Sequence, residues 1–202
     1  MIRLRRHRRT ESEDGQSLVE FSMIITVMML LLLGMLEFGF LFDQHLTLEY
    51  SSREGARVGA ALANGTTTFP CASVDDQVIA AVQRVLTSPG SRIDASQVTE
   101  IRIYKATSTG GQSGSLANIW SYSAGAGPSI DGKNLDFIPG TINWSACSRS
   151  NTTSAPDSLG VSVNYTYQAV TPLSAVMSFF GGPGPASIPI TDRTVMALNP
   201  GN

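Results

Sequence analysis

The longest apolar stretch of the chain runs from Leu18 to Phe42 and covers about 25 residues. At 1.5 Å per residue, a helix of that length crosses a hydrocarbon core of ~30 Å with some tilt. Two carboxylates interrupt the stretch. Glu20 lies near its start, and Glu37 lies about five residues from its outer end, where a side chain can reach the membrane interface. The pattern therefore predicts one transmembrane helix over residues 18–42.

The helical pattern continues beyond the apolar stretch. From Asp43 to Ala63 the chain contains no proline and is rich in helix formers, and Asn64-Gly65 supplies a C-terminal stop. We therefore expect a single helix over residues 16–63. Small residues recur four positions apart in it, which permits close approach of another backbone, either the protein's own head or a neighbouring subunit. These pairs are Gly55/Gly59 and Ala56/Ala60.

Residues 64–202 predict a small α+β head. Ser73-Val74-Asp75-Asp76 has the spacing of a capping box and opens a helix that ends before Pro89. A second helical pattern covers residues 172–180. Alternation of apolar and polar residues predicts three strands, with Ile101 and Ile103 inward in the first. The three strands cover residues 98–105, 159–170 and 187–198.

Residues 107–157 are rich in Gly, Ser, Asn and Thr, with scattered aromatic residues. A loop of this length is functional, is disordered, or contains short strands. The predicted fold class is therefore α+β. A long N-terminal transmembrane helix continues into a head in which a short helix packs on a small antiparallel sheet, with 107–157 as a loop-rich segment.

Residues 1–15 form a basic leader with five arginines on the N-terminal side of the apolar stretch. The positive-inside rule predicts a cytoplasmic N-terminus and export of everything after Phe42. A cleaved secretory signal peptide is disfavoured, because the apolar run exceeds the usual 7–15 residues and no A-x-A site closes it. The arginines are Arg3, Arg5, Arg6, Arg8 and Arg9.

The order of features at the N-terminus resembles the class III signal of type IV pilins. The basic leader is followed by Gly15, by a glutamate five residues later, and by a long apolar helix. In that signal a prepilin peptidase cuts after the glycine on the cytoplasmic side. The resemblance places the cut between Gly15 and Gln16 and makes Glu20 the fifth residue of the mature chain. Glu20 would then offset the new α-amine of Gln16, or reach that of the next subunit in an assembly. Gln16 departs from the usual small or apolar residue, which predicts less efficient processing.

Three further segments strengthen this interpretation: G-Q-S-L-V-E-F, G-M-L-E-F-G-F and S-S-R-E-G-A-R-V-G-A-A. Together they resemble the TadE-like family, the pseudopilins of tight-adherence (Flp, type IVb) pilus systems, over residues 15–63. The resemblance implies a single-pass protein of the cell (inner) membrane, a minor or assembly component of such a pilus or a related secretion machine. Its partners would be the lipid bilayer, the prepilin peptidase and other pilus or pseudopilin subunits through the N-terminal helix. The alternative is an uncleaved, membrane-anchored binding protein with an exported head that binds a ligand or surface.

Charge and cysteine content agree with an exported, anchored chain. The 202 residues are 15% charged with a formal net charge of −2, and removal of residues 1–15, which hold five arginines and three acids, leaves −4. No basic face then remains to pair nucleic acid phosphates. Cys71 and Cys147 both lie on the exported side, where an isolated pair forms one disulfide, the alternative being two free buried thiols.

Catalytic motifs are not found in the sequence. The two histidines are His7, in the leader, and His45, just past the apolar stretch, so no Ser-His-Asp set or H-E-x-x-H motif can be assembled. Residues 110–114 lack the pattern of a nucleophile elbow or a phosphate loop. Residues 131–136 contain two carboxylates, but Lys133 stands where a calcium ligand would be needed. We expect no enzyme activity, cofactor or metal.

Overall fold

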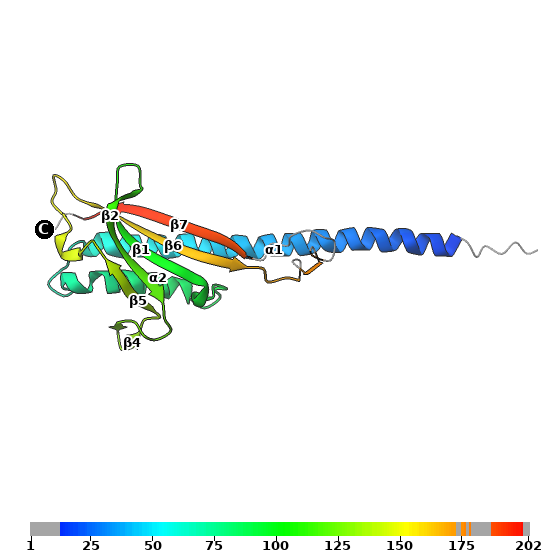
Figure 1. Ribbon diagram of the computed structural model, residues 1–202, viewed down its shortest axis with the longest axis horizontal. Helices are drawn as coiled ribbons and strands as arrows, with labels where there is room; N and C mark the ends of the chain where they lie inside the picture. The colour runs from blue at the N-terminus through cyan, green and yellow to red at the C-terminus, as the bar shows by residue number, and fades with distance from the viewer. Residues whose placement is uncertain (1–12, 173–174, 177, 179–186, 200–202) are drawn as a thin grey trace, which may run out of the picture. The chain divides into compact units, whose positions relative to one another are not determined.

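The computed structural model describes residues 13–172, 175–176, 178 and 187–199 (Figure 1). It contains a long apolar N-terminal helix, a short helix and a five-stranded antiparallel sheet, the α+β, pilin-like arrangement that the sequence predicts. The chain divides into two compact units. The N-terminal unit comprises Met1–Phe40 and Ala169–Ala186, and the head unit comprises Leu41–Gln168 and Ser187–Asn202. The five leader arginines lie outside the described residues.

Helix α1 spans Glu13–Leu62, so it begins three residues before the predicted start, inside the leader. It ends where Ala63 and Gly65 adopt φ values of 50° and 109°. Gly65 is needed at this turn, because a Cβ there would lie 2.6 Å from the backbone nitrogen of Cys71. The stop signal at Asn64-Gly65 therefore depends on a backbone conformation and a close approach to Cys71 that require glycine at position 65.

The sheet has the strand order β5-β2-β1-β6-β7, with every neighbouring pair antiparallel. Its strands are β1 (Val98–Ala106), β2 (Gln112–Tyr122), β5 (Phe137–Ile142), β6 (Ser158–Gln168) and β7 (Ser187–Ala197). A separate hairpin pairs β3 (Ser129–Ile130) with β4 (Lys133–Asn134). Pro189 is tolerated within β7, because this strand lies at the edge of the sheet.

The predicted loop at residues 107–157 contains regular strands. It supplies β2 and β5, which form one side of the sheet, and it buries Trp120, Phe137 and Trp144. Gly and Asn in β2, and Pro and Gly in β5, are poor strand formers, so the composition hid both strands. Pairing stabilises them instead, since β2 pairs with β1 and β5 pairs with β2. Of the three alternatives open for this segment, the structure bears out the presence of strands.

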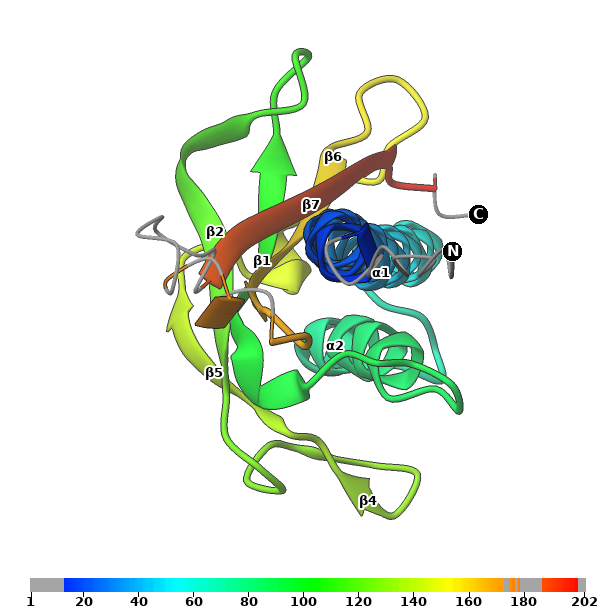
Figure 2. The same cartoon turned by 90° about the vertical axis from the view of Figure 1, so that its right-hand side faces the viewer.

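Helix α2 (Val74–Leu86) and the C-terminal half of α1 cover one face of the sheet (Figure 2). Ile101 and Ile103 of β1 are fully buried beneath them, as the sequence predicts. The predicted capping box is wrong, however. The Ser73 hydroxyl makes no cap bond to α2 and donates instead to the Pro70 carbonyl at 2.9 Å, within the turn that contains the 3₁₀ helix Cys71–Ser73.

The small residues of α1 pack against the head itself. A Cβ on Gly55 would lie 2.5 Å from Cγ2 of Val82, and a Cβ on Gly59 would lie 3.0 Å from Cδ1 of Leu159. Ala56 and Ala60, which directly follow these glycines in the sequence, are also buried. The sequence left open whether these pairs face a neighbouring subunit or the protein's own head, and the structure shows the latter.

Two smaller elements complete the described chain. The 3₁₀ helices Ala95–Gln97 and Ala146–Ser148 precede β1 and follow β5. The predicted helix at residues 172–180 lies mostly outside the described residues, although Ala175, Val176 and Ser178 are helical. The predicted strand at 159–170 is β6, which begins one residue earlier and ends at Gln168.

Candidate functional site

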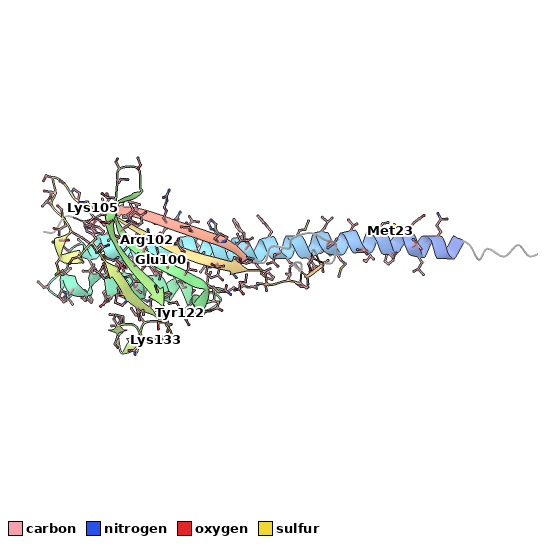
Figure 3. The ribbon with its side chains drawn as sticks, in the orientation of Figure 1. Met23, Glu100, Arg102, Lys105, Tyr122 and Lys133 are labelled. Atoms are coloured by element: carbon pink, nitrogen blue, oxygen red, sulfur yellow. A yellow bond between two sulfur atoms is a disulfide. The ribbon has the colours of Figure 1, made fainter. Side chains whose placement is uncertain are left out.

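Most of the large apolar side chains in the N-terminal half of α1 are exposed. In Figure 3, Met23 and its neighbours project from the helix without a packing partner in view. An 18-residue window of this helix has a mean hydropathy of 2.3, so it is long and apolar enough to cross a membrane. A helix that is apolar all round is suited to lipid rather than to water. Eleven side chains here are more than half exposed: Leu18, Val19, Phe21, Met23, Ile24, Val27, Met28, Met29, Leu31, Met35 and Leu36.

The hydroxyl groups within this apolar half are satisfied by the helix itself. Ser22 Oγ donates to the Val19 carbonyl at 2.8 Å, and Thr26 Oγ1 donates to the Ser22 carbonyl at 2.7 Å. These bonds remove the cost of placing an unpaired hydroxyl in hydrocarbon. Ser22 and Thr26 are therefore compatible with a surrounding of lipid.

Gly15, Gln16 and Glu20 lie on the first turns of α1. The Gln16 amide donates from Nε2 to Oε1 of Glu20 at 2.9 Å, and both residues are exposed. Within the described part of the chain, no heavy atom lies within 4 Å of a Cβ built on Gly15, so packing does not require glycine there. Gly15 and Gln16 are the third and fourth residues of α1, within its first turn. The Gly15–Gln16 bond thus lies where the helix frays most easily.

Glu37, the second carboxylate of the apolar stretch, is buried. Its two oxygens accept hydrogen bonds from the backbone N–H groups of Val170 (3.0 Å) and Thr171 (2.9 Å), and from the Thr171 hydroxyl. All three donors belong to the N-terminal unit. The sequence predicted an interfacial carboxylate that could reach water. Glu37 instead binds residues 170–171 to α1 by hydrogen bonds. Glu37 and these residues are more than 130 positions apart in sequence, so no local pattern indicates the contact.

A second buried polar cluster lies in the head unit and joins α2 to the segment after β5. Arg149 Nη2 donates to Oδ1 of Asp75 at 2.6 Å, and Asn118 Nδ2 donates to Oδ2 of Asp75 at 2.6 Å. The guanidinium stacks over the Trp144 ring with its carbon 4.4 Å from the ring centroid. Asn118 Oδ1 also accepts from the backbone N–H of Trp144 at 2.8 Å. Four residues from three elements thereby hold one another in the core.

The disulfide between Cys71 and Cys147 closes the same region, with Cα atoms 5.0 Å apart. It links the turn before α2 to the 3₁₀ helix Ala146–Ser148, next to Arg149. Sequence reasoning identified the two cysteines but missed Asp75 and Arg149. Their sequence positions could have indicated that they lie close together, because Asp75 follows Cys71 and Arg149 follows Cys147 by only a few residues.

Within the described residues, no group of three or more His, Cys, Asp or Glu side chains is placed to hold a metal ion. In the segment weighed for calcium, Asp131 and Gly132 form the turn between β3 and β4, with φ values of 50° and 76°. Asp136 is engaged elsewhere, because its carboxylate accepts from the Gln83 side chain at 2.7 Å and from the Gly125 N–H at 2.8 Å.

An apolar helix that continues into a small α+β head defines a pilin-like class of protein, and the helix suggests a membrane anchor or a signal sequence. Comparison with protein families makes the assignment more specific. Residues 15–57 match the family model described as TadE-like protein, so this segment is a TadE-like domain. No curated protein and no solved structure matches the chain.

Proposed function

We propose that the protein is a membrane-anchored pseudopilin, a minor or assembly component of a tight-adherence (Flp, type IVb) pilus or a related secretion machine that serves adhesion. One observation carries the proposal. Within the TadE-like domain, the N-terminal half of α1 exposes apolar side chains, whereas its C-terminal half packs into a folded head. Such a helix can leave its lipid environment for a subunit bundle without unfolding the head. The expected role is structural, with no catalytic step and no cofactor.

The proposed orientation has the N-terminus in the cytoplasm and the head exported from the cell membrane. The five leader arginines support it through the positive-inside rule. The disulfide in the head supports it as well, because such bonds persist in oxidising compartments. Protease added to spheroplasts should therefore remove the head. Protection of the head, together with an active cytosolic reporter fused at Asn202, would reverse the orientation.

Processing by a prepilin peptidase would cut the chain between Gly15 and Gln16. The new α-amine would then lie one helical turn from Glu20, whose carboxylate the Gln16 side chain already approaches. Within one subunit, the amine and the amide of residue 16 would compete for the same carboxylate. Between subunits, Glu20 could pair with the amine of a neighbour and thereby offset a charge in lipid. Lipid and neighbouring subunits are thus the partners of this half of α1, and nucleic acid is not.

The second candidate function is that of a permanently anchored binding protein. Gln16 after the scissile glycine favours this candidate, because it departs from the usual small or apolar residue. The intact mass of the membrane-extracted protein separates the two candidates. A mass without residues 1–15 supports the pseudopilin, and a full-length mass in cells that process other prepilins supports the uncleaved anchor.

Two substitutions test the roles of Gly15 and Glu20. We expect Gly15→Ala to block processing, and Glu20→Ala to leave processing and insertion intact but lower subunit assembly and pilus-dependent adhesion. Ser22→Ala is the matched control, since it removes a polar group from the same half of α1 whose bond is internal to the helix. Assembly of the Glu20→Ala protein at the wild-type level would overturn the pairing.

A further inference from the structure

The outer face of the sheet, opposite α2, carries a row of polar residues across three strands. In the antiparallel register, Arg102 of β1 lies opposite Ser162 of β6, and Ser162 lies opposite Arg193 of β7. Neighbouring strands are about 4.8 Å apart, so the two arginine positions flank Ser162 at a separation of about 10 Å. Both guanidinium groups can reach a group seated over the small serine. Figure 3 shows Glu100 and Arg102 on β1.

This row forms part of a hollow of about 230 Å³ on the outer face. The next row supplies Asn164 and Thr191, which lie opposite each other on β6 and β7. The side chains that line the hollow are therefore hydrogen-bonding groups from adjacent strands rather than apolar residues. Ser162 at its floor is 8% exposed, and its hydroxyl donates to no group among the described residues.

Tyr104 forms one wall of the hollow and is held in place from two sides. A Cβ on Gly160 would lie 2.2 Å from Cζ of Tyr104, so the ring lies across this glycine. The Tyr104 hydroxyl donates to the Gly110 carbonyl at 3.0 Å. Burial raises the pKa of Tyr104, so its hydroxyl stays neutral and adds no negative charge to the hollow. Tyr104 is thus positioned by a packing contact and a hydrogen bond, and the face keeps its positive charge.

The charges on this face leave one cation uncompensated. Arg102 Nε donates to Oε1 of Glu100 at 2.6 Å, and Arg102 Nη1 donates to Oε1 of Gln112 at 2.9 Å. Arg102 still has free N–H groups after these bonds, because a guanidinium has five. Arg193 is exposed and makes no hydrogen bond or ion pair within the described part of the chain. Two arginines and one glutamate leave a net charge of +1 facing the hollow.

We propose that this hollow is a binding site for an acidic sugar, with the carboxylate of a uronate seated over Ser162 between Arg102 and Arg193. The net charge of +1 matches a monoanion, and a guanidinium pairs a planar carboxylate in a fork geometry. Asn164 and Thr191 are placed to bond the sugar hydroxyls. The proposal is independent of the pilus assignment, because an unprocessed chain would carry the same hollow.

The rival occupant is an acidic side chain of another protein. It would use the two arginines but would leave the amide and hydroxyl groups of Asn164 and Thr191 without ligand partners. Unpaired polar groups lower affinity, because their desolvation is then not compensated. The hydroxyl-bearing ligand fits the full set of groups lining the hollow, and the test therefore includes glutamate as a competitor.

The experiment is titration calorimetry on the full-length chain in detergent micelles, with sodium D-glucuronate as the probe. We expect a Kd of about 1 mM, ordinary for a small ligand on an open site, and weaker binding at higher salt. D-Glucose, which lacks the carboxylate, and L-glutamate, which lacks the sugar hydroxyls, should each bind at least about 10-fold more weakly.

Two variants locate the binding. Arg193→Gln should weaken the binding of glucuronate at least about 10-fold. Arg57→Gln, which changes an exposed arginine of α1, should leave this affinity unchanged. Ser162→Leu fills the hollow without changing its charge and should abolish binding. Unchanged fluorescence of the buried Trp120 and Trp144 shows that each variant is folded. Glucuronate binding no tighter than that of glucose or glutamate, or equal loss in Arg57→Gln, would overturn the proposal.

Discussion

The two halves of α1 share one secondary structure but have opposite surroundings. In the N-terminal half, large apolar side chains such as Phe21 and Met35 are more than 60% exposed. In the C-terminal half, Leu48 and Ala56 are fully buried against the head. Helical propensity cannot distinguish these halves, because both consist of good helix formers. The difference lies in residue size and in the solvent that each half requires.

The glycines of the two halves show the same contrast. Among the described residues, no heavy atom lies within 4 Å of a Cβ built on Gly34, whereas a Cβ on Gly55 would collide with Val82. Polar side chains differ in their partners as well. Glu37 is held by backbone groups of residues 170–171, while Ser52 donates to Asp192 and bonds Thr194 of β7 at 2.9 Å. The N-terminal half of α1 thus exposes apolar side chains and binds residues 170–171 through Glu37, whereas the C-terminal half packs into a folded core.

The largest expected effect comes from removing the disulfide of the head. A closed loop of this length, with a sequence separation of 76 residues, stabilises a fold by about 4–5 kcal/mol on the chain-entropy model. We expect Cys71→Ser/Cys147→Ser to lower the free energy of unfolding by up to that amount, measured by denaturant titration with tryptophan fluorescence. Non-reducing peptide mapping should also recover Cys71 linked to Cys147. Recovery of both as free thiols without reductant would contradict this prediction.

Arg149→Met should have the next largest effect, about 3–5 kcal/mol, because it leaves the Asp75 carboxylate buried without its cation. The matched control is Arg57→Met, whose pair with Glu54 is exposed and should contribute little. Both variants are compared by denaturant unfolding of the full-length chain in detergent. Similar stabilities for the two variants would mean that the buried pair does not hold the head together.

A matched pair of glycine substitutions tests the two halves of α1 directly. Gly55→Val should lower the free energy of unfolding of the head by about 1–3 kcal/mol, because the new side chain overpacks against Val82. Gly34→Val introduces the same residue into open surroundings and should leave the unfolding curve unchanged. The contrast between the halves fails if both substitutions have the same effect on Trp120 and Trp144 fluorescence.

The smallest effect on stability is expected at Glu37, where the consequence is local. Glu37→Ala removes the acceptor of two backbone N–H groups, so hydrogen exchange at Val170 and Thr171 should rise by about 10-fold. Thr171→Val removes the hydroxyl bond alone and should produce a smaller rise. Unfolding of the head should not change in either variant. Unchanged exchange at both amides would show that Glu37 does not hold this segment.

Much of the fold could be predicted because its signals are local in sequence. Apolar length predicted the long helix, and alternation predicted β1 and β6, including the inward positions of Ile101 and Ile103. Strands β2 and β5 escaped because Gly and Asn in β2, and Pro139 and Gly140 in β5, are poor strand formers. Pairing of β2 with β1, and of β5 with β2, stabilises them. The predicted Ser73 cap was wrong because the Ser73 hydroxyl donates to the Pro70 carbonyl and accepts no N–H of α2.

The sequence by itself determined that an apolar helix precedes an α+β head, and its resemblance to type IV pilins predicts a leader junction at Gly15, Gln16 and Glu20. These features depend on composition and spacing along one segment. Only the tertiary structure decided that Gly55 and Gly59 face the protein's own core, that Glu37 binds residues 170–171, and that Arg102 and Arg193 flank Ser162. Each of these relations joins segments far apart in the chain. Strand register and helix packing determine such contacts, because they select which side chains meet, and no local pattern encodes that choice.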